Sequence, residues 1–240
     1  MNGGSAYRPE FEAALRLFAQ VSEAMHRRGL SRPILVGGAA AEFWSASAVS
    51  TGDFDICTPL QPELEEEMRR HGFRRPSGAG QLLKGWVHPE LKLGFEVVAE
   101  VPMDGNVDAA HIRLVQPVGE TALFRVISVE DLIADRMGQF ASGTAPDRIG
   151  QARLLLALHP DADLDYLERR IRQETMGDHG IESIKGDSEP PVIRMDDLGA
   201  RLARRKAELG LPDLPRNAGT RRTPSKRALL KAIEEIGGKW

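Results

Sequence analysis

The stretch "TGDFDICTP", residues 51–59, decides how the rest of the chain is interpreted. Asp53 and Asp55 flank Phe54, and Ile56 follows, which is the alternation of a short strand. Successive side chains of a strand point to opposite faces, so the two carboxylates share one face and the two apolar side chains share the other. Neighbouring carboxylates repel each other unless a cation or a donor lies between them. The pattern predicts a strand whose acidic face either meets water or binds a cation.

The composition is that of an ordinary soluble globular protein. The chain has 240 residues, of which 41% are hydrophobic and 28% charged, and its net charge of −3 gives no sign of an overall basic nucleic-acid binder. The single cysteine, Cys57, excludes an internal disulfide and a cysteine-rich zinc site and fits a cytoplasmic location. The N-terminal residues lack the pattern of a signal peptide, and no apolar run is long enough to cross a bilayer. We therefore expect a cytoplasmic protein without membrane contact.

Hydrophobic periodicity predicts an α/β (α+β) chain with a small mixed sheet flanked by helices. We expect helices over residues 8–30, 39–47, 61–73, 129–141, 145–159 and 161–174, and strands over 33–38, 53–58, 81–88, 93–101, 111–116 and 122–127. Ser128 followed by Asp131 predicts the start of the helix at 129, because a serine at this position caps the free N–H groups of the first turn. From that point on the pattern is helical.

We expect three segments along the chain. A core covers residues 1–125, a helical subdomain covers 126–175, and a polar linker with a basic tail covers 176–240. Six basic residues are concentrated near the C-terminus: Arg216, Arg221, Arg222, Lys226, Arg227 and Lys231. Such a run is usually a solvated segment, but it also has the charge to bind RNA phosphates.

Two glycines precede the acidic strand and extend the pattern. Gly37 and Gly38 end one predicted strand just before a predicted helix, and a glycine turn of this kind lets a phosphate approach the backbone at the start of a helix. The paired aspartates are hard oxygen ligands of the kind that Mg²⁺ uses to bridge a protein to substrate phosphates. A third carboxylate on a neighbouring strand would complete a two-metal site. We favour Glu96 over Glu100 for this place, because Glu100 is near the end of its strand.

Taken in order, these stretches resemble a known family. The chain has "VGGAAAEFW" at 36–44, "STGDFDI" at 50–56, "ISVEDLIADRM" at 127–137 and "APDRIGQARLLL" at 145–156. This order resembles the DNA polymerase β-type nucleotidyltransferase superfamily and, within it, the AbiEii-like toxin nucleotidyltransferases. The resemblance implies the nucleotidyltransferase fold, followed by a helical subdomain.

The resemblance also implies a reaction and a set of site residues. The reaction is transfer of a nucleoside monophosphate from an NTP to an acceptor, with Mg²⁺ or Mn²⁺ as cofactor. Metal binding and catalysis are implied for Asp53, Asp55 and Glu96, and nucleotide binding for Gly37, Gly38, Thr51, Arg136 and Asp147. The acceptor stays open between RNA or tRNA, a protein and a small molecule. A toxin of a toxin–antitoxin or phage-defence pair would also have a cognate antitoxin as its partner.

Three positions depart from the family's pattern and favour an alternative. Val49 stands where an arginine is common, Arg136 replaces a lysine, and Pro146 precedes Asp147 where a basic residue is common. The alternative is a catalytically degenerate nucleotidyltransferase-fold protein with a binding or regulatory role. An Asp-x-Asp pair also occurs in phosphatases of the haloacid dehalogenase type, where a Thr or Val is expected at the position of Cys57, and in glycosyltransferases, which nothing else in the chain supports.

Overall fold

The computed structural model describes residues 6–76, 85–91 and 93–185, and the isolated residues 200, 203–205, 207, 208, 210 and 231. Contacts divide the chain into two units, Met1–Asp187 and Ser188–Trp240. The described residues of 200–208 are helical, and the basic run at 216–227 lies outside the described residues. Within the described part of the chain, no helix combines the length and the apolar character needed to cross a membrane.

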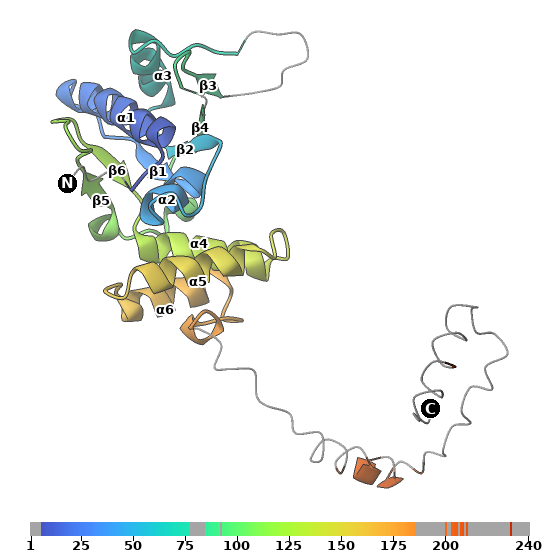
Figure 1. Ribbon diagram of the computed structural model, residues 1–240. Helices are drawn as coiled ribbons and strands as arrows, with labels where there is room; N and C mark the ends of the chain where they lie inside the picture. Colours follow the sequence, from blue (N-terminus) through green and yellow to red (C-terminus); the bar gives the residue numbers. More distant parts are fainter. Residues whose placement is uncertain are drawn as a thin grey trace. The chain divides into compact units, whose positions relative to one another are not determined.

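A six-stranded mixed sheet lies at the centre of the first unit, in the order β3-β4-β2-β1-β6-β5 (Figure 1). Its strands are β1 (Ile34–Val36), β2 (Asp53–Cys57), β3 (Trp86–Val87), β4 (Gly94–Ala99), β5 (Arg113–Val115) and β6 (Phe124–Val126). The acidic strand β2 is hydrogen-bonded on both sides, antiparallel to β1 and parallel to β4. The predicted mixed sheet is therefore confirmed, with strands shorter than the apolar runs that predicted them.

Helices flank this sheet and then form a cluster of their own. They are α1 (Pro9–Arg27), α2 (Gly37–Trp44), α3 (Gln61–Arg70), α4 (Val129–Ala141), α5 (Arg148–Leu158) and α6 (Leu164–Glu174). Figure 1 shows α4, α5 and α6 stacked next to α2, where the chain leaves β6. The helix predicted over 129–141 has these bounds, and the Asp131 backbone N–H donates to Ser128 Oγ at 3.0 Å as expected of its cap. The predicted division at residue 125 stays a prediction.

The apolar face of β2 is buried against α1. The Phe54 ring lies 5.3 Å from the Phe11 ring and 6.2 Å from the Phe18 ring, between ring centroids, and Phe54 and Ile56 are both buried. Burying side chains of this size accounts for much of the stability of such a layer. Because one face of β2 is filled in this way, its two aspartates point to the opposite face.

Helix α2 differs from its prediction at both ends. It begins at Gly37, two residues earlier than expected, because Gly37 adopts a left-handed φ of +60° that turns β1 directly into the helix. It ends at Trp44, since Ala46 and Ser47 have φ values of +48° and +63° that no helix can continue. The helix is therefore shorter than its apolar pattern suggests.

A buried carboxylate holds the helical cluster together. Asp131 of α4 is fully buried and accepts hydrogen bonds from Arg170 Nε at 2.6 Å, from Tyr166 Oη at 3.0 Å and from Ser128 Oγ at 2.9 Å. Arg170 and Tyr166 both belong to α6, so this network joins α4 to α6. The cluster continues past residue 175, since Ile184 is only 2% exposed.

Candidate functional site

The register of the sheet brings a third acid beside the two aspartates. Asp55 of β2 pairs with Glu96 of β4, and Asp53 pairs with Gly94. Paired residues of neighbouring parallel strands point to the same face, so the three carboxylates share the face opposite α1. Glu100, the other acid considered for this place, follows the end of β4 and is exposed.

The two glycines lie directly against Asp55 and against Thr51, which binds Asp53. A Cβ added to Gly37 would lie 2.0 Å from Asp55 Oδ2, and one added to Gly38 would lie 2.4 Å from Thr51 Oγ1. The Gly38 backbone N–H donates to Asp55 Oδ2 at 3.2 Å. The first turn of α2 can therefore approach the acidic strand only because both positions lack a side chain.

The pKa of Asp55 is raised in the folded protein. Burial raises its pKa, the negative charges of Asp53 and Glu96 raise it further, and the Gly38 N–H and the positive charge of Arg136 act in the opposite direction. The ionised form of Asp55 is therefore unfavourable in the protein without a bound ligand. A bound cation would relieve this cost directly.

Arg136 of α4 is the buried cation of the site. Its side chain is 5% exposed, and Nη1 lies 3.3 Å from both Asp135 Oδ2 and Gln139 Oε1. Burial lowers its pKa, and the attraction of Asp135 and Asp55 opposes that shift. Its Nε has no hydrogen-bond partner among the described residues. A buried N–H group of this kind is expected to bind an acceptor.

Asp147 stands at the edge of this arrangement. It precedes α5, its side chain is 74% exposed, and it lies 3.9 Å from Arg148. Its negative charge acts on Arg136 and opposes the lowering of the pKa of that guanidinium by burial. It is therefore near the predicted nucleotide-binding residues but is not packed among them.

A second buried carboxylate, which the sequence did not single out, supports the loop before β2. Glu42 of α2 is fully buried and accepts hydrogen bonds from the Thr51 backbone N–H at 2.7 Å, from Ser47 Oγ at 3.0 Å and from Arg8 Nη2 at 2.9 Å. Arg8 Nη2 also donates to the Thr51 carbonyl, and Thr51 Oγ1 donates to Asp53 Oδ1 at 3.0 Å. The sequence feature that indicates this role is the position of Glu42, an acid within an otherwise apolar helix.

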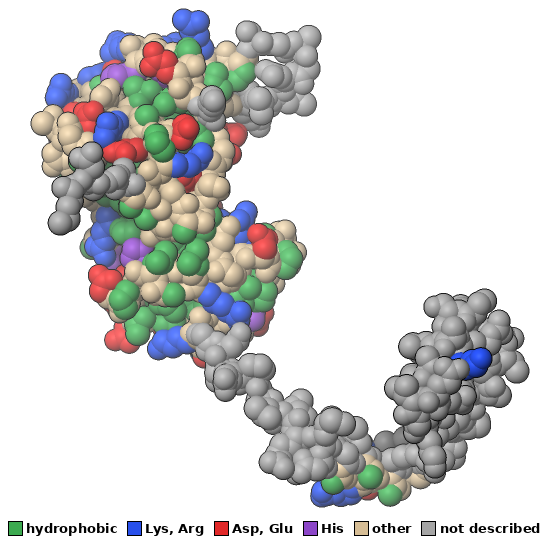
Figure 2. Space-filling model, in the orientation of Figure 1, with side chains coloured by type: hydrophobic (Ala, Val, Ile, Leu, Met, Phe, Trp, Pro, Cys, Tyr) green, Lys and Arg blue, Asp and Glu red, His purple; other side chains and the backbone are tan. Residues whose placement is uncertain are grey.

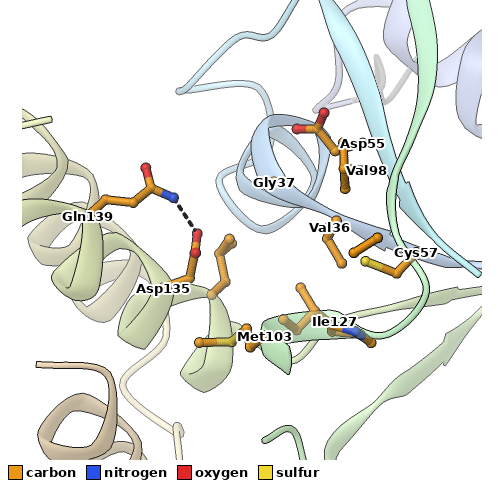
Figure 3. Close-up of a pocket in the computed structure, with 12 residues that line it drawn as sticks. Val36, Gly37, Asp55, Cys57, Val98, Met103, Ile127, Asp135 and Gln139 are labelled. Atoms are coloured by element: carbon orange, nitrogen blue, oxygen red, sulfur yellow. Dashed lines mark hydrogen bonds between the residues drawn. The ribbon is translucent and has the colours of Figure 1, made fainter. Parts of the chain in front are cut away.

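A pocket of about 300 Å³ opens beside Asp55, between the acidic face of the sheet and α4 (Figure 3). It is lined by Val36, Gly37, Asp55, Cys57, Val98, Ala99, Pro102, Met103, Ile127, Leu132, Asp135 and Gln139. Burial and the Asp55 charge raise the pKa of the Cys57 thiol to about 11, so the thiol is neutral. The prediction did not single out Met103, Asp135 and Gln139, because Met103 lies in a segment without periodicity and Asp135 and Gln139 look like ordinary polar residues of a helix.

The acidic residues fit a divalent cation by their chemistry. Asp53 and Asp55 each engage one carboxylate oxygen with a protein donor, which leaves the other oxygen of each for a ligand. Oxygen ligands of this kind suit Mg²⁺, which binds through one or two carboxylates together with substrate phosphates. Within the described part of the chain, no group of three or more His, Cys, Asp or Glu side chains is drawn together closely enough to hold a metal ion.

The sequence matches no protein-family model and no curated protein, whereas the fold matches solved structures. An antigenic nucleotidyltransferase-like protein from Paracoccidioides brasiliensis is 14% identical, with a TM-score of 0.50 over 74% of this chain and 93% of that one. MenT4, a nucleotidyltransferase toxin from Mycobacterium tuberculosis, is 17% identical, with a TM-score of 0.40 over 97% of this chain and 96% of that one. The first of these structures shows that the chain has a nucleotidyltransferase-like fold, as its motifs predict.

Proposed function

We propose that this protein transfers a nucleoside monophosphate from an NTP to the hydroxyl of an acceptor, releasing pyrophosphate, and uses Mg²⁺ or Mn²⁺ as its cofactor. One observation carries the proposal: Asp53, Asp55 and Glu96 share one face of adjacent strands, and Asp55 lies directly against Gly37 at the start of α2. The nucleotidyltransferase-like fold and the raised pKa of Asp55, which a cation would relieve, support it further.

Each residue of the site has a role in this proposal. Asp53 and Asp55 hold the divalent cation, which when bound neutralises the negative charge of the triphosphate. Glu96 accepts the proton of the acceptor hydroxyl, since it is the neighbouring carboxylate on the same face. The backbone N–H groups at the start of α2, at Gly37 and Gly38, bind phosphate oxygens.

The remaining predicted residues act around this centre. Arg136 adds positive charge to the triphosphate site, and its unused Nε is a donor for a phosphate oxygen. Thr51 orients Asp53 through its hydroxyl. Asp147 lies at the rim and interacts with the nucleotide through Arg136.

We extend the proposal to the biological setting on the strength of the motif resemblance. The acceptor is RNA or tRNA, a protein or a small molecule, and the protein acts in the cytoplasm as the toxin of a toxin–antitoxin or phage-defence pair. An antitoxin would then be its protein partner. Co-expression with the gene product encoded next to it, followed by a growth assay, tests this part separately from the chemistry.

The proposed chemistry is tested by titrating the protein with each NTP in the presence and absence of Mg²⁺. The wild type is expected to bind at least one NTP in a Mg²⁺-dependent way, and Asp53→Asn and Asp55→Asn to weaken that binding about tenfold or more, since each removes a charged metal ligand. Asp161→Asn, an exposed acid in the helical part, is the matched control and should bind as the wild type does. Unchanged Mg²⁺-dependent binding in both site variants would contradict the proposal.

A binding or regulatory protein without catalysis is the second candidate. The observation that favours it is that the three acids are not drawn together as ligands of one ion within the described residues. The same titration separates the two candidates, because a protein that binds no NTP with any divalent cation supports the second.

A further inference from the structure

The pocket between the sheet and α4 meets the proposed site at Asp55 and Gly37, and the rest of its lining has no role in the transfer step described above. We propose that it takes the nucleobase of the NTP, and that Asp135 selects bases with an exocyclic amino group. This inference rests on the proposed function, since it names the substrate class of the same site. It is carried by the pocket's continuity with Asp55, by the chemistry of its walls and by a strained segment that closes it.

The walls of the pocket fit a flat and largely apolar group. Most of the lining is aliphatic or sulfur-containing, from Val36, Cys57, Val98, Met103, Ile127 and Leu132. The volume of about 300 Å³ is at the lower end of the range of about 300–1,000 Å³ typical of small-molecule sites. The pocket reaches Asp55 and Gly37 at one side, so a base placed in it stays connected to phosphates at the start of α2.

The polar edge of the pocket is rigid and presents an acceptor. Gln139 Nε2 donates to Asp135 Oδ2 at 2.9 Å, and Gln139 Oε1 accepts from Arg136 Nη1 at 3.3 Å. Figure 3 shows Asp135 and Gln139 on α4, across the pocket from Asp55 and Val98. The second Asp135 oxygen has no hydrogen bond among the described residues.

A carboxylate can only accept a hydrogen bond, and this determines which bases fit. Adenine and cytosine carry an exocyclic amino group, and guanine carries one at C2, so each can donate to Asp135. Uracil has a carbonyl oxygen in place of the cytosine amino group, so it can donate to Asp135 only through its N3–H, which lies between two carbonyl oxygens that the carboxylate repels. A site built to bond a donor discriminates strongly against an analogue that lacks it.

The far wall of the pocket contains backbone strain of the kind found at ligand sites. Met103 and Asp104 have φ values of +47° and +53°, in the left-handed region that residues other than glycine rarely adopt. Such a conformation is unfavourable for these residues and persists only when its surroundings impose it. Arg170, which is held by buried Asp131, donates from Nη2 to Met103 Sδ at 3.4 Å. The buried network of the helical cluster therefore fixes a side chain of the pocket.

The test uses calorimetric titration of the full chain with ATP, GTP, CTP, UTP and inorganic tripolyphosphate, each with Mg²⁺. Val98 is 51% exposed, so Val98→Trp fills the pocket without disturbing the core, and Val118→Trp, at an 80% exposed valine in a different groove, is its control. Asp135→Asn keeps the shape of the side chain and adds an N–H donor that can meet a carbonyl oxygen. Circular dichroism of each variant confirms that it is folded.

We expect the wild type to bind at least one amino-bearing NTP about tenfold more tightly than UTP, because a hydrogen bond to a charged group is worth about that factor. Asp135→Asn should reduce this ratio to about threefold or less. Val98→Trp should weaken NTP binding about tenfold while tripolyphosphate binding changes less than about threefold, and Val118→Trp should change neither.

The outcomes separate the two proposals. Wild-type NTP affinity in Val98→Trp would overturn the assignment of the pocket to the base. Equal affinity of the wild type for all four NTPs would overturn selection by Asp135, while the proposed function would stand. A wild type that binds no NTP would overturn the proposed function and this inference together.

Discussion

Two buried carboxylates of this protein each pair with an arginine, but one lies beside the candidate site and the other lies within the helical cluster. Glu42 and Asp131 are both fully buried, and each is bound by an arginine from a distant part of the chain, Arg8 and Arg170. The Arg170 side chain is 4% exposed, whereas that of Arg8 is 32% exposed. The Asp131–Arg170 network is sealed within the helical cluster. The Glu42–Arg8 network opens to solvent beside Thr51.

The difference shows how position decides the role of a buried ion pair. Such pairs are costly to bury, and removing one partner leaves an uncompensated charge whose cost depends on how much water reaches it. The Asp131 network joins two helices and so acts mainly on stability. The Glu42 network ends on Thr51, whose hydroxyl binds Asp53, and so acts on the geometry of the candidate site as well.

The largest effect is expected for the sealed network. Asp131→Ala leaves the Arg170 guanidinium buried, with Glu174 at 2.9 Å as its remaining carboxylate partner among the described residues, and should lower the free energy of unfolding by about 3–5 kcal/mol. Urea denaturation measures this loss. The double variant Asp131→Ala/Arg170→Met removes the stranded charge and should recover part of it. A loss below about 1 kcal/mol in the single variant would show that the two networks do not differ as described.

A smaller effect on stability, joined to an effect on binding, is expected for the open network. Glu42→Gln keeps the shape of the side chain but removes the charge that binds Arg8, and should cost about 1.5–3 kcal/mol because Arg8 remains partly hydrated. Mg²⁺-dependent NTP binding should weaken as well, since Thr51 loses its fixed position. Denaturation and NTP titration of the same sample measure the two effects together.

The control for this variant is Glu12→Gln, at another glutamate that pairs with an arginine, Arg16, but on the surface of α1. It should change stability by no more than about 0.5 kcal/mol and leave NTP binding unchanged. If Glu42→Gln lowered stability without changing binding, its network would be structural in the same sense as that of Asp131.

The smallest effect has the opposite sign and belongs to the site itself. The pKa of Asp55 is raised above its ordinary value of 3.8 in the folded protein, chiefly by burial, so the folded state binds this proton more tightly than the unfolded state. The ionised group therefore lowers stability at neutral pH, and that penalty fades as the pH falls through the raised pKa toward 3.8.

Asp55→Asn should accordingly raise the melting temperature at pH 7, by less than the roughly 2–4 °C that about 1 kcal/mol produces in a domain of this size, because Asp55 is only half-buried and solvent screens its charge. The gain should shrink as the pH is lowered, which thermal melts at several pH values would show. Asp53→Asn, at an exposed acid of the same strand, is the control and should shift the melting temperature less. A destabilised Asp55→Asn protein would mean that the Gly38 hydrogen bond outweighs the burial of the charge.

Much of this architecture follows from local patterns in the sequence. Steps of three and four predict α1, the serine cap predicts the first residue of α4, and alternation around Phe54 predicts β2 and the face on which its acids lie. These features depend on residues a few positions apart. Periodicity within one chain is sufficient to find them.

The rest depends on contacts between distant segments. The preference for Glu96 over Glu100 rested on strand position alone, and its pairing with Asp55 is set by the register between β2 and β4. The Arg8–Glu42 pair joins residues 34 positions apart, and Met103 enters the pocket from a segment without regular structure. Such pairings come from how the elements pack, which no local spacing encodes. The roles of the site residues themselves stay predictions.

The close approach of Gly38 to Thr51 also limits the order in which this sequence can drift. A side chain at position 38 would meet the threonine hydroxyl at 2.4 Å, so a larger residue there is harmful as long as Thr51 is present. Thr51 would have to be replaced by a smaller residue first, and that step already frees Asp53 from its hydrogen bond. A lineage that kept selection on Asp53 would thus preserve both positions. A lineage without selection on Asp53 would be expected to change Thr51 before Gly38.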